Sequence, residues 1–322
     1  MKKILLTIFI LTSIALCGCQ PKMNIFPDGT DPLLEKKLQG EGEHKVLVVS
    51  IDGTISDESK RGLLSNSPSL IQEVSSRLKL AAEDDKVKAL VLKVNSPGGS
   101  VTASDILYNE IVRFKEKTGA KVIVNMMDVA ASGGYYVSLP ADHIMAHPTT
   151  LTGSVGVIFI RPKVEGLMEK IGVSVEVSKS GRNKDMGFPF KPDTPEQKKI
   201  IDDIIKDYAD RFQGLVKKHR SISEDQLKAI FTAQVFSAQG AKKAGLVDSL
   251  GYLPDAVKTA CKLAGIDENS QVITYKHKSY PNDTLYNSAS SQAFSPALIN
   301  IDAGNLMPPK AGFHYLWLPA AE

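Results

Sequence analysis

Three segments of the sequence carry residue types suited to acyl chemistry, and each follows a run typical of a β-strand. The first covers residues 95–100 and reads Asn-Ser-Pro-Gly-Gly-Ser. A Gly-Gly turn lets backbone N–H groups face a cleft with no side chain in the way. Such N–H groups can hold an oxyanion. A plain turn between a strand and a helix has the same composition, so this segment leaves both interpretations open.

The second segment, residues 128–136, contains Ser132 between two alanines and two glycines. A strand-like run precedes this serine, and an apolar run typical of a helix follows it. The hydroxyl would then project from a helix N-terminus, where free N–H groups favour developing negative charge. This is the logic of a nucleophile elbow, although the Gly-x-Ser-x-Gly pattern is absent. A serine in this place is also a common N-cap.

The third segment, residues 180–187, contains Lys184 in a polar turn. A serine hydroxyl is a poor nucleophile at neutral pH and needs a nearby base. None of the six histidines lies in a recognisable triad, but His143 and His147 follow Ser132 closely and remain candidates. A lysine serves as a base only when it is neutral, which requires burial to lower its pKa. The sequence does not show such burial.

The elements that would position these segments alternate between strand and helix patterns. We expect strands near residues 46–51, 89–94, 121–127, 143–146, 153–159 and 173–177, and helices near 69–82, 103–117, 194–219 and 253–263. Thr194 and the Pro-Glu-Gln after it predict a capped start for the third helix. Repeated strand-helix units predict a layered α/β domain with largely parallel sheets.

Composition limits the classes of function. The chain has 322 residues, of which 43% are hydrophobic and 23% charged, so a sizeable core is possible. The net charge is +3, from 39 basic and 36 acidic residues, and basic residues form no dense patch interleaved with aromatics. We therefore expect no nucleic-acid partner.

The N-terminus has the features of an exported protein. Two lysines follow Met1, residues 4–16 are apolar, and Cys17-Gly18-Cys19 comes next. The apolar run is shorter than the roughly 20 residues of a membrane span and fits a signal peptide. The cysteine motif is similar to a bacterial lipobox, with lipid on Cys19; an uncleaved N-terminal anchor is the alternative. Either predicts attachment to a membrane of the bacterial cell envelope, with the folded part outside the cytoplasm.

These patterns predict four regions. They are a lipoprotein-type signal peptide over residues 1–19, a Pro- and Gly-containing linker over 20–44, an α/β domain over 45–265, and a partly flexible C-terminal extension over 266–322. Near the end of that extension, residues 314–318 are apolar and could dock on the body or on another subunit.

Four motifs taken in order resemble signal peptide peptidase SppA (protease IV), in its short bacterial form with one catalytic domain. They lie at residues 95–99, 131–136, 152–157 and 180–185. The resemblance covers residues 45–265 and implies a crotonase/Clp-protease-like fold. It also implies a Ser/Lys dyad, in which Ser132 is the nucleophile and Lys184 the general base. Ser154 matches the hydroxyl that orients the lysine, and the N–H of Gly99 matches the oxyanion hole; we add the N–H of Gly133 on geometric grounds.

The resemblance further implies a serine endopeptidase that needs no metal and no cofactor. Its substrates would be cleaved signal peptides and other short apolar segments. The family assembles as ring-like homo-oligomers in which the serine and the lysine of one site come from neighbouring subunits.

Two other functions are compatible with parts of the sequence. A crotonase-type acyl-CoA enzyme would share the fold and the Gly-Gly oxyanion turn, but it predicts a cytosolic chain with acidic catalytic residues. A catalytically silent envelope lipoprotein, acting as a scaffold, would use the same motifs only as turns.

Overall fold

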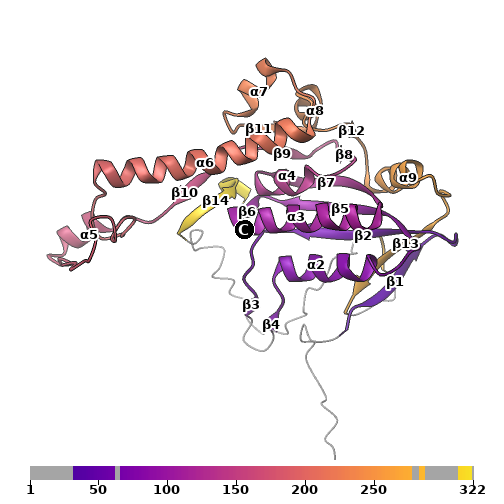
Figure 1. Ribbon diagram of the computed structural model, residues 1–322, viewed down its shortest axis with the longest axis horizontal. Coiled ribbons are helices and arrows are strands. Elements are labelled where there is room, and N and C mark those ends of the chain that lie inside the picture. Colours follow the sequence, from indigo (N-terminus) through magenta and orange to yellow (C-terminus); the bar gives the residue numbers. More distant parts are fainter. Residues whose placement is uncertain (1–31, 62–65, 278–282, 287–310, 321–322) are drawn as a thin grey trace, which may run out of the picture.

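A large, mostly parallel sheet forms the centre of the protein (Figure 1). The structure, a computed structural model, describes residues 32–61, 66–277, 283–286 and 311–320. In spatial order the sheet contains β1 (Leu34–Gln39), β13 (Gln271–Lys276), β2 (Lys45–Asp52), β5 (Val87–Ser96), β7 (Lys121–Ala131), β8 (His143–Ala146) and β12 (Ser249–Leu250). A branch at the end of β7 adds β9 (Leu151–Gly153) and β11 (Val235–Ser237).

Two smaller sheets accompany it. One contains β10 (Ile158–Ile160), β14 (Gly312–Leu316) and β6 (Gly98–Ser100), in that order, and the other pairs β3 (Lys60–Arg61) with β4 (Asn66–Ser67). The helices are α2 (Leu70–Ala81), α3 (Val101–Thr118), α4 (Gly133–Ser138), α5 (Glu165–Lys170), α6 (Pro195–His219), α7 (Glu224–Ile230), α8 (Ala238–Lys243) and α9 (Leu253–Ala264).

The expected α/β class is confirmed. Neighbouring strands from β13 to β12 run parallel, whereas β1 and β11 are antiparallel to their partners. Alternate residues of β2 face opposite sides: Leu47 and Val49 lie in the core under α2 and α3, and Val46 and Val48 lie in the core under α9. Helices thus cover both faces, which explains the unbroken apolar runs of the central strands.

An arm projects from this body. Beyond β10 the chain forms α5 and a long turn, and α6 then leads back across the domain (Figure 1). Thr194 caps α6, and its hydroxyl accepts from the amide of Gln197, whose side chain accepts from the Thr194 amide. This reciprocal pair is the capping box that the sequence predicts.

Three sequence-based boundaries differ from the structure. The expected linker is wrong for Leu34–Gln39, which forms β1 beside β13. The fold does not end at residue 265, because Gln271–Lys276 is the strand β13 between β1 and β2. Residues 173–177 form no strand, since their valines lie exposed on the arm with no neighbouring strand to pair with. The expected signal peptide, with Cys17 and Cys19, lies outside the described residues.

No helix within the described ranges is both long enough and apolar enough to span a membrane.

Phe212 offers a test of the core. Its side chain is fully buried, and its ring lies 4.9 Å from the rings of both Tyr136 and Tyr315. We expect Phe212→Ala to lower the free energy of unfolding by about 3–5 kcal/mol, because a large cavity replaces the ring. The matched control Leu263→Ala, at a side chain that is 40% exposed, should cost about 0.5 kcal/mol. Urea titration measures both, and equal losses would contradict this view of the core.

Candidate active site

Ser132 occupies a strained turn between β7 and α4. Its backbone has φ 52° and ψ −114°, which a residue with a side chain rarely adopts, and only 1% of the residue is exposed. Its amide donates to the Gly153 carbonyl (2.8 Å), and its own carbonyl accepts from the Tyr136 amide (2.8 Å). The turn is therefore held on both sides. The Ser132 hydroxyl makes no hydrogen bond within the described part of the chain.

Beside this turn runs β6, one edge of which is already paired. Ile55 donates to the Gly98 carbonyl (2.8 Å) and accepts from the Ser100 amide (3.0 Å). Successive backbone groups of a strand alternate in direction, so the Gly99 amide between them faces the opposite edge. The sequence-based expectation for Gly99 concerned this amide.

The strand β14 lies along that opposite edge and fills the groove between β6 and β10. It is antiparallel to both, with Tyr315 opposite Gly99. The Trp317 amide donates to the Pro97 carbonyl (2.9 Å). Hydrogen-bonded pairs recur every second residue in an antiparallel ladder. Because Trp317 and Pro97 form such a pair, Gly99 and Tyr315, two residues along each strand, form one as well. In such a pair the Gly99 amide faces the Tyr315 carbonyl.

Glycine geometry confirms how closely this carbonyl approaches the turn. A Cβ on Gly98, at φ +104°, would lie 1.9 Å from the Tyr315 carbonyl oxygen and 2.7 Å from the Gly133 nitrogen. A Cβ on Gly133 would lie 3.0 Å from the same oxygen. Only glycine permits this approach. The Tyr315 carbonyl thus lies beside Gly98 and beside Gly133, the residue that follows Ser132.

The Tyr315 side chain fills an aromatic pocket built by α4 and α6. Its ring stacks on Tyr136 (5.0 Å between centroids), and its hydroxyl donates to the Tyr208 carbonyl (2.8 Å). The Tyr136 hydroxyl in turn donates to Asp105 (2.6 Å), which Arg211 also binds. Burial raises the pKa of Tyr315 well above its usual range, so the phenol stays neutral. The pocket suits a large, uncharged ring.

Ser154 also lies at this site. It follows β9, has φ 51°, and is 8% exposed, and its amide donates to the Gln234 carbonyl (2.8 Å). Gly153, the residue before it, accepts from the Ser132 amide. The structure therefore brings together Ser132, Ser154 and the two glycine amides that the sequence analysis singled out.

Lys184 does not join them within one chain. It is exposed in the turn between α5 and α6, and its side-chain amine makes no hydrogen bond or ion pair with described residues. Figure 1 places that segment at the far end of the arm, away from α4.

The candidate histidines are engaged elsewhere. The His143 ring bonds the Ser249 hydroxyl (2.7 Å), and the His147 ring bonds the Thr149 hydroxyl (2.8 Å) and lies edge-on to Tyr252. Neither has a hydrogen bond to Ser132 among these contacts, so the geometry gives no support to a histidine base.

Sequence reasoning missed the role of β14. The apolar run at residues 314–318 was the one available signal, but it did not say where the segment docks. Its position depends on the free edge of β6, which is formed by residues more than two hundred positions earlier in the chain.

Comparisons with known proteins identify families and structures that this chain resembles. Residues 114–267 match the model of peptidase family S49, and residues 65–152 match that of Clp protease. A putative signal peptide peptidase SppA of Enterococcus faecium is 34% identical over 77% of this chain and 72% of its own length. Protease 4 of Haemophilus influenzae is 33% identical over 83% of this chain but only 43% of its own length. A ClpP1 mutant from Listeria monocytogenes covers 65% of this chain and 93% of its own, with 20% identity and a TM-score of 0.41.

The occupied groove makes a testable prediction. Removing residues 312–322 should accelerate labelling of Ser132 by a serine-reactive phosphonate at least about tenfold, because only chains with β14 displaced could react before. Labelling is followed by mass spectrometry, and circular dichroism verifies folding. Leu318→Gly, in the same tail but exposed, is the control and should leave the rate unchanged. Equal rates for full and shortened chains would refute occlusion by β14.

Proposed function

This chain belongs to peptidase family S49, and we propose that this serine protease cleaves peptide bonds with Ser132 as nucleophile and Lys184 of a neighbouring copy as base. The observation that carries the proposal is the Tyr315 carbonyl, which lies close to Gly98 and to Gly133, the residue after Ser132, while Tyr315 pairs with Gly99 across the ladder. A substrate strand in the place of β14 would present its scissile carbonyl to the serine in the same way.

The reaction is acyl transfer in two halves. Neutral Lys184 takes the proton of the Ser132 hydroxyl, and the oxygen attacks the peptide carbonyl carbon. The resulting oxyanion is stabilised by the Gly99 and Gly133 amides. Protonated Lys184 gives its proton to the leaving amine, and water then repeats the sequence on the acyl-enzyme. Ser154 would orient the lysine.

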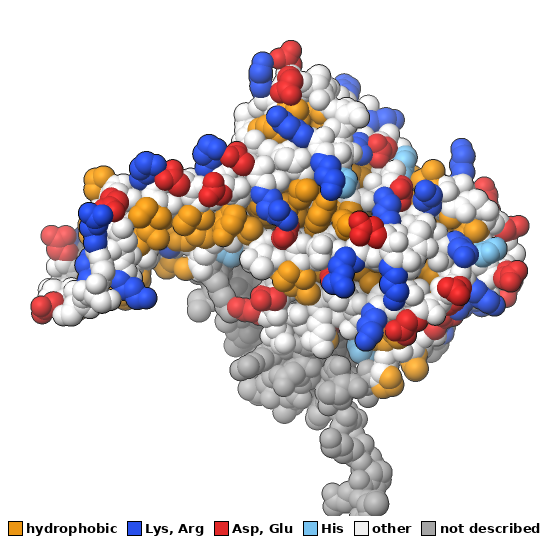
Figure 2. All heavy atoms as spheres, in the orientation of Figure 1, with side chains coloured by type: hydrophobic (Ala, Val, Ile, Leu, Met, Phe, Trp, Pro, Cys, Tyr) orange, Lys and Arg blue, Asp and Glu red, His pale blue; other side chains and the backbone are white. Residues whose placement is uncertain are grey.

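The proposal places the base in a second copy because a lysine acts as a base only when burial favours its neutral form, and Lys184 is exposed in the single chain. Docking the arm on another subunit would bury the Lys184 amine, and desolvation lowers a lysine pKa. The arm has the surface for such docking: Leu167 and Ile171 are 61% and 63% exposed. Figure 2 shows a stripe of apolar side chains along α6, where Ile204 and Ile205 are only partly buried. These features support a ring-like homo-oligomer.

The groove supports short, extended, apolar peptides as substrates. The edges of β6 and β10 would bind the peptide through its backbone, which does not depend on its sequence. The aromatic pocket around Tyr315 favours a large apolar side chain before the cleaved bond. Signal peptides released from exported proteins have this apolar character. With lipid on Cys19, the enzyme would work at a membrane of the bacterial cell envelope, outside the cytoplasm, where such peptides remain.

The dyad is tested by subunit mixing. Ser132→Ala and Lys184→Ala should each lower kcat on an apolar signal-peptide substrate at least about 10⁴-fold. Co-assembled in equal amounts, the two inactive variants should regain about one quarter of normal activity, because that share of head-to-tail interfaces combines an intact serine with an intact lysine. Activity in either single variant would rule out the dyad, and mixtures as inactive as their parts would rule out a shared site.

Lipidation has its own test. Cys19→Ser should release the protein from the membrane fraction, and mass spectrometry of the membrane-bound natural protein should find a diacylglyceryl-modified Cys19. Gly18→Ala is the matched control and should leave the protein attached. An unmodified Cys19 in membrane-purified protein would exclude the lipid anchor.

A further inference from the structure

The residue after Lys184 is turned inward. Two consecutive tight turns carry this segment: the Lys184 amide donates to the Gly181 carbonyl (3.1 Å) and the Met186 amide to the Asn183 carbonyl (3.0 Å). Lys184 is exposed, whereas the side chain of Asp185 is only 6% exposed. A buried carboxylate is costly unless it is paired and hydrogen-bonded, so the contacts of Asp185 indicate what this loop is built to hold.

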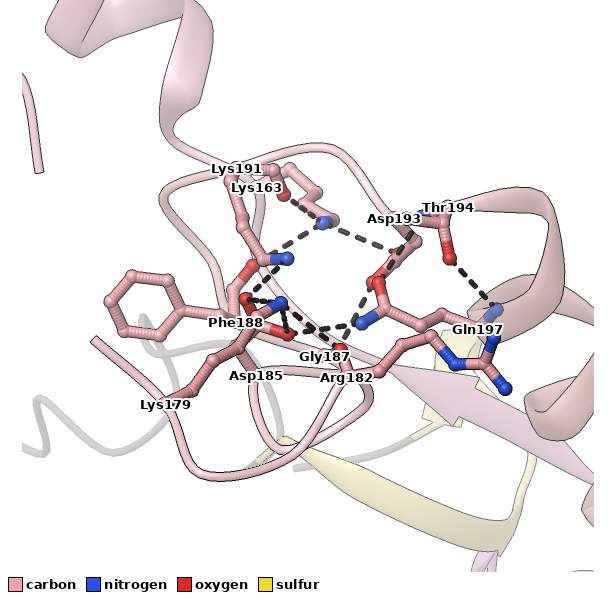
Figure 3. Close-up of polar contacts among 10 residues, drawn as sticks. All are labelled: Lys163, Lys179, Arg182, Asp185, Gly187, Phe188, Lys191, Asp193, Thr194 and Gln197. Carbon is pink, nitrogen blue, oxygen red and sulfur yellow. Dashed lines mark hydrogen bonds and ion pairs between the residues drawn. The ribbon is translucent and has the colours of Figure 1, made fainter. Parts of the chain in front are cut away.

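Three side chains hold Asp185 from different directions (Figure 3). Lys179, before the turn, reaches both carboxylate oxygens (2.9 and 2.8 Å), and Lys191, after it, forms a 2.6 Å ion pair. The Gln197 amide of α6 donates to the same carboxylate at 3.0 Å. Hydrogen bonds from Lys179 and Lys191 hold the pKa of Asp185 well below its usual range. These contacts therefore favour the ionised carboxylate.

Gln197 connects this carboxylate to the start of α6. The residue is fully buried, and its side-chain oxygen accepts from the Thr194 amide (3.1 Å) while its nitrogen donates to Asp185. One side chain thus closes the capping box and fixes the loop. The position of the turn relative to α6 follows from this bond.

A second carboxylate ties the same loop to the substrate groove. The side chain of Asp193 is 2% exposed and accepts from Arg161 and from the Gly187 amide (3.2 Å). Arg161 directly follows β10, which forms one wall of the groove. The hydrogen bond from Arg161 lowers the pKa of Asp193 to about 2. The loop is therefore anchored at both its middle and its end.

The two lysines that flank Lys184 are both paired with Asp185, whereas the Lys184 amine is not. Of the three lysines between residues 179 and 191, Lys179 and Lys191 pair with Asp185, and the side-chain amine of Lys184 has no partner among the described residues. We propose that Asp185 is a positioning residue: by binding Lys179, Lys191 and Gln197 it fixes the turn so that Lys184 projects into the serine site of a second copy. This inference rests on the proposed function.

The first test replaces the carboxylate. Asp185→Asn should lower kcat per titratable serine about a hundredfold, the cost of a misplacement of about 1 Å, with KM and oligomeric state unchanged. A merely structural defect would instead lower the number of titratable serines or the assembly. Glu196→Gln is the matched control, because Glu196 joins the same loop to α6 through an exposed pair with Arg182; its kcat should stay within about twofold.

An exchange variant guards against a folding defect. Gln197→Glu keeps the acceptor that caps Thr194 but sets a second carboxylate against Asp185, so it should lower kcat as Asp185→Asn does. Combining the two changes restores one carboxylate and one amide across the contact, and kcat should recover at least about tenfold from either single variant. Absence of recovery in a correctly assembled double variant would overturn the pairing.

Subunit mixing then locates the defect. Asp185→Asn co-assembled with Ser132→Ala should regain activity, because the Ser132→Ala chain supplies an intact lysine loop to the serine of the other chain. Co-assembly with Lys184→Ala should not. A normal kcat in Asp185→Asn, or no recovery with Ser132→Ala, would overturn the role of Asp185 even though the dyad stands. Full activity in Lys184→Ala would overturn the proposed function itself.

Discussion

A buried backbone N–H group must find a hydrogen-bond partner, and the outer edge of β6 has no partner within the main sheet. Ile55 pairs one edge of Gly98–Ser100, and the other edge faces the groove. Here β14 supplies the missing strand. The same requirement makes the groove a receptor for any extended peptide, because backbone pairing is indifferent to sequence. The unpaired edge of β6 thus explains both why β14 occupies the groove and why the groove would bind other peptides.

The strained turn at Ser132 places a nucleophile beside this groove. Strain at a residue with positive φ persists only where neighbouring contacts fix it, and Gly153 and Tyr136 provide those contacts. The glycines have no side chain where the backbones approach: a Cβ on Gly98 would overlap the Tyr315 carbonyl, and a Cβ on Gly133 would crowd the same oxygen and overlap the Ser104 hydroxyl. Glycine at these positions is therefore a requirement of the geometry, and it also leaves the amides accessible.

Much of this could be read from the sequence, because it depends on local patterns. The apolar runs at residues 46–51 and 89–94 become central strands, and Thr194 caps α6 as its neighbours predict. What failed depends on partners distant in the chain. The β1 segment looks like a linker until β13 pairs with it, and residues 173–177 alternate like a strand but have no neighbouring edge. Ser132 could be singled out; the strand that covers it could not.

The separation of Ser132 from Lys184 has a consequence for control. A lysine acts as a base only when it is desolvated. In a single chain Lys184 is exposed to water, and its two neighbouring lysines, Lys179 and Lys191, are paired with Asp185. A lone chain would then combine a strained serine, an occupied groove and an exposed amine far from the serine, an arrangement that would not cleave peptides. Assembly would supply the burial that the amine lacks, and substrate would compete with β14 for one edge of β6. Proteolysis would thus require two events: assembly, which buries the Lys184 amine, and displacement of β14 from β6 by the substrate.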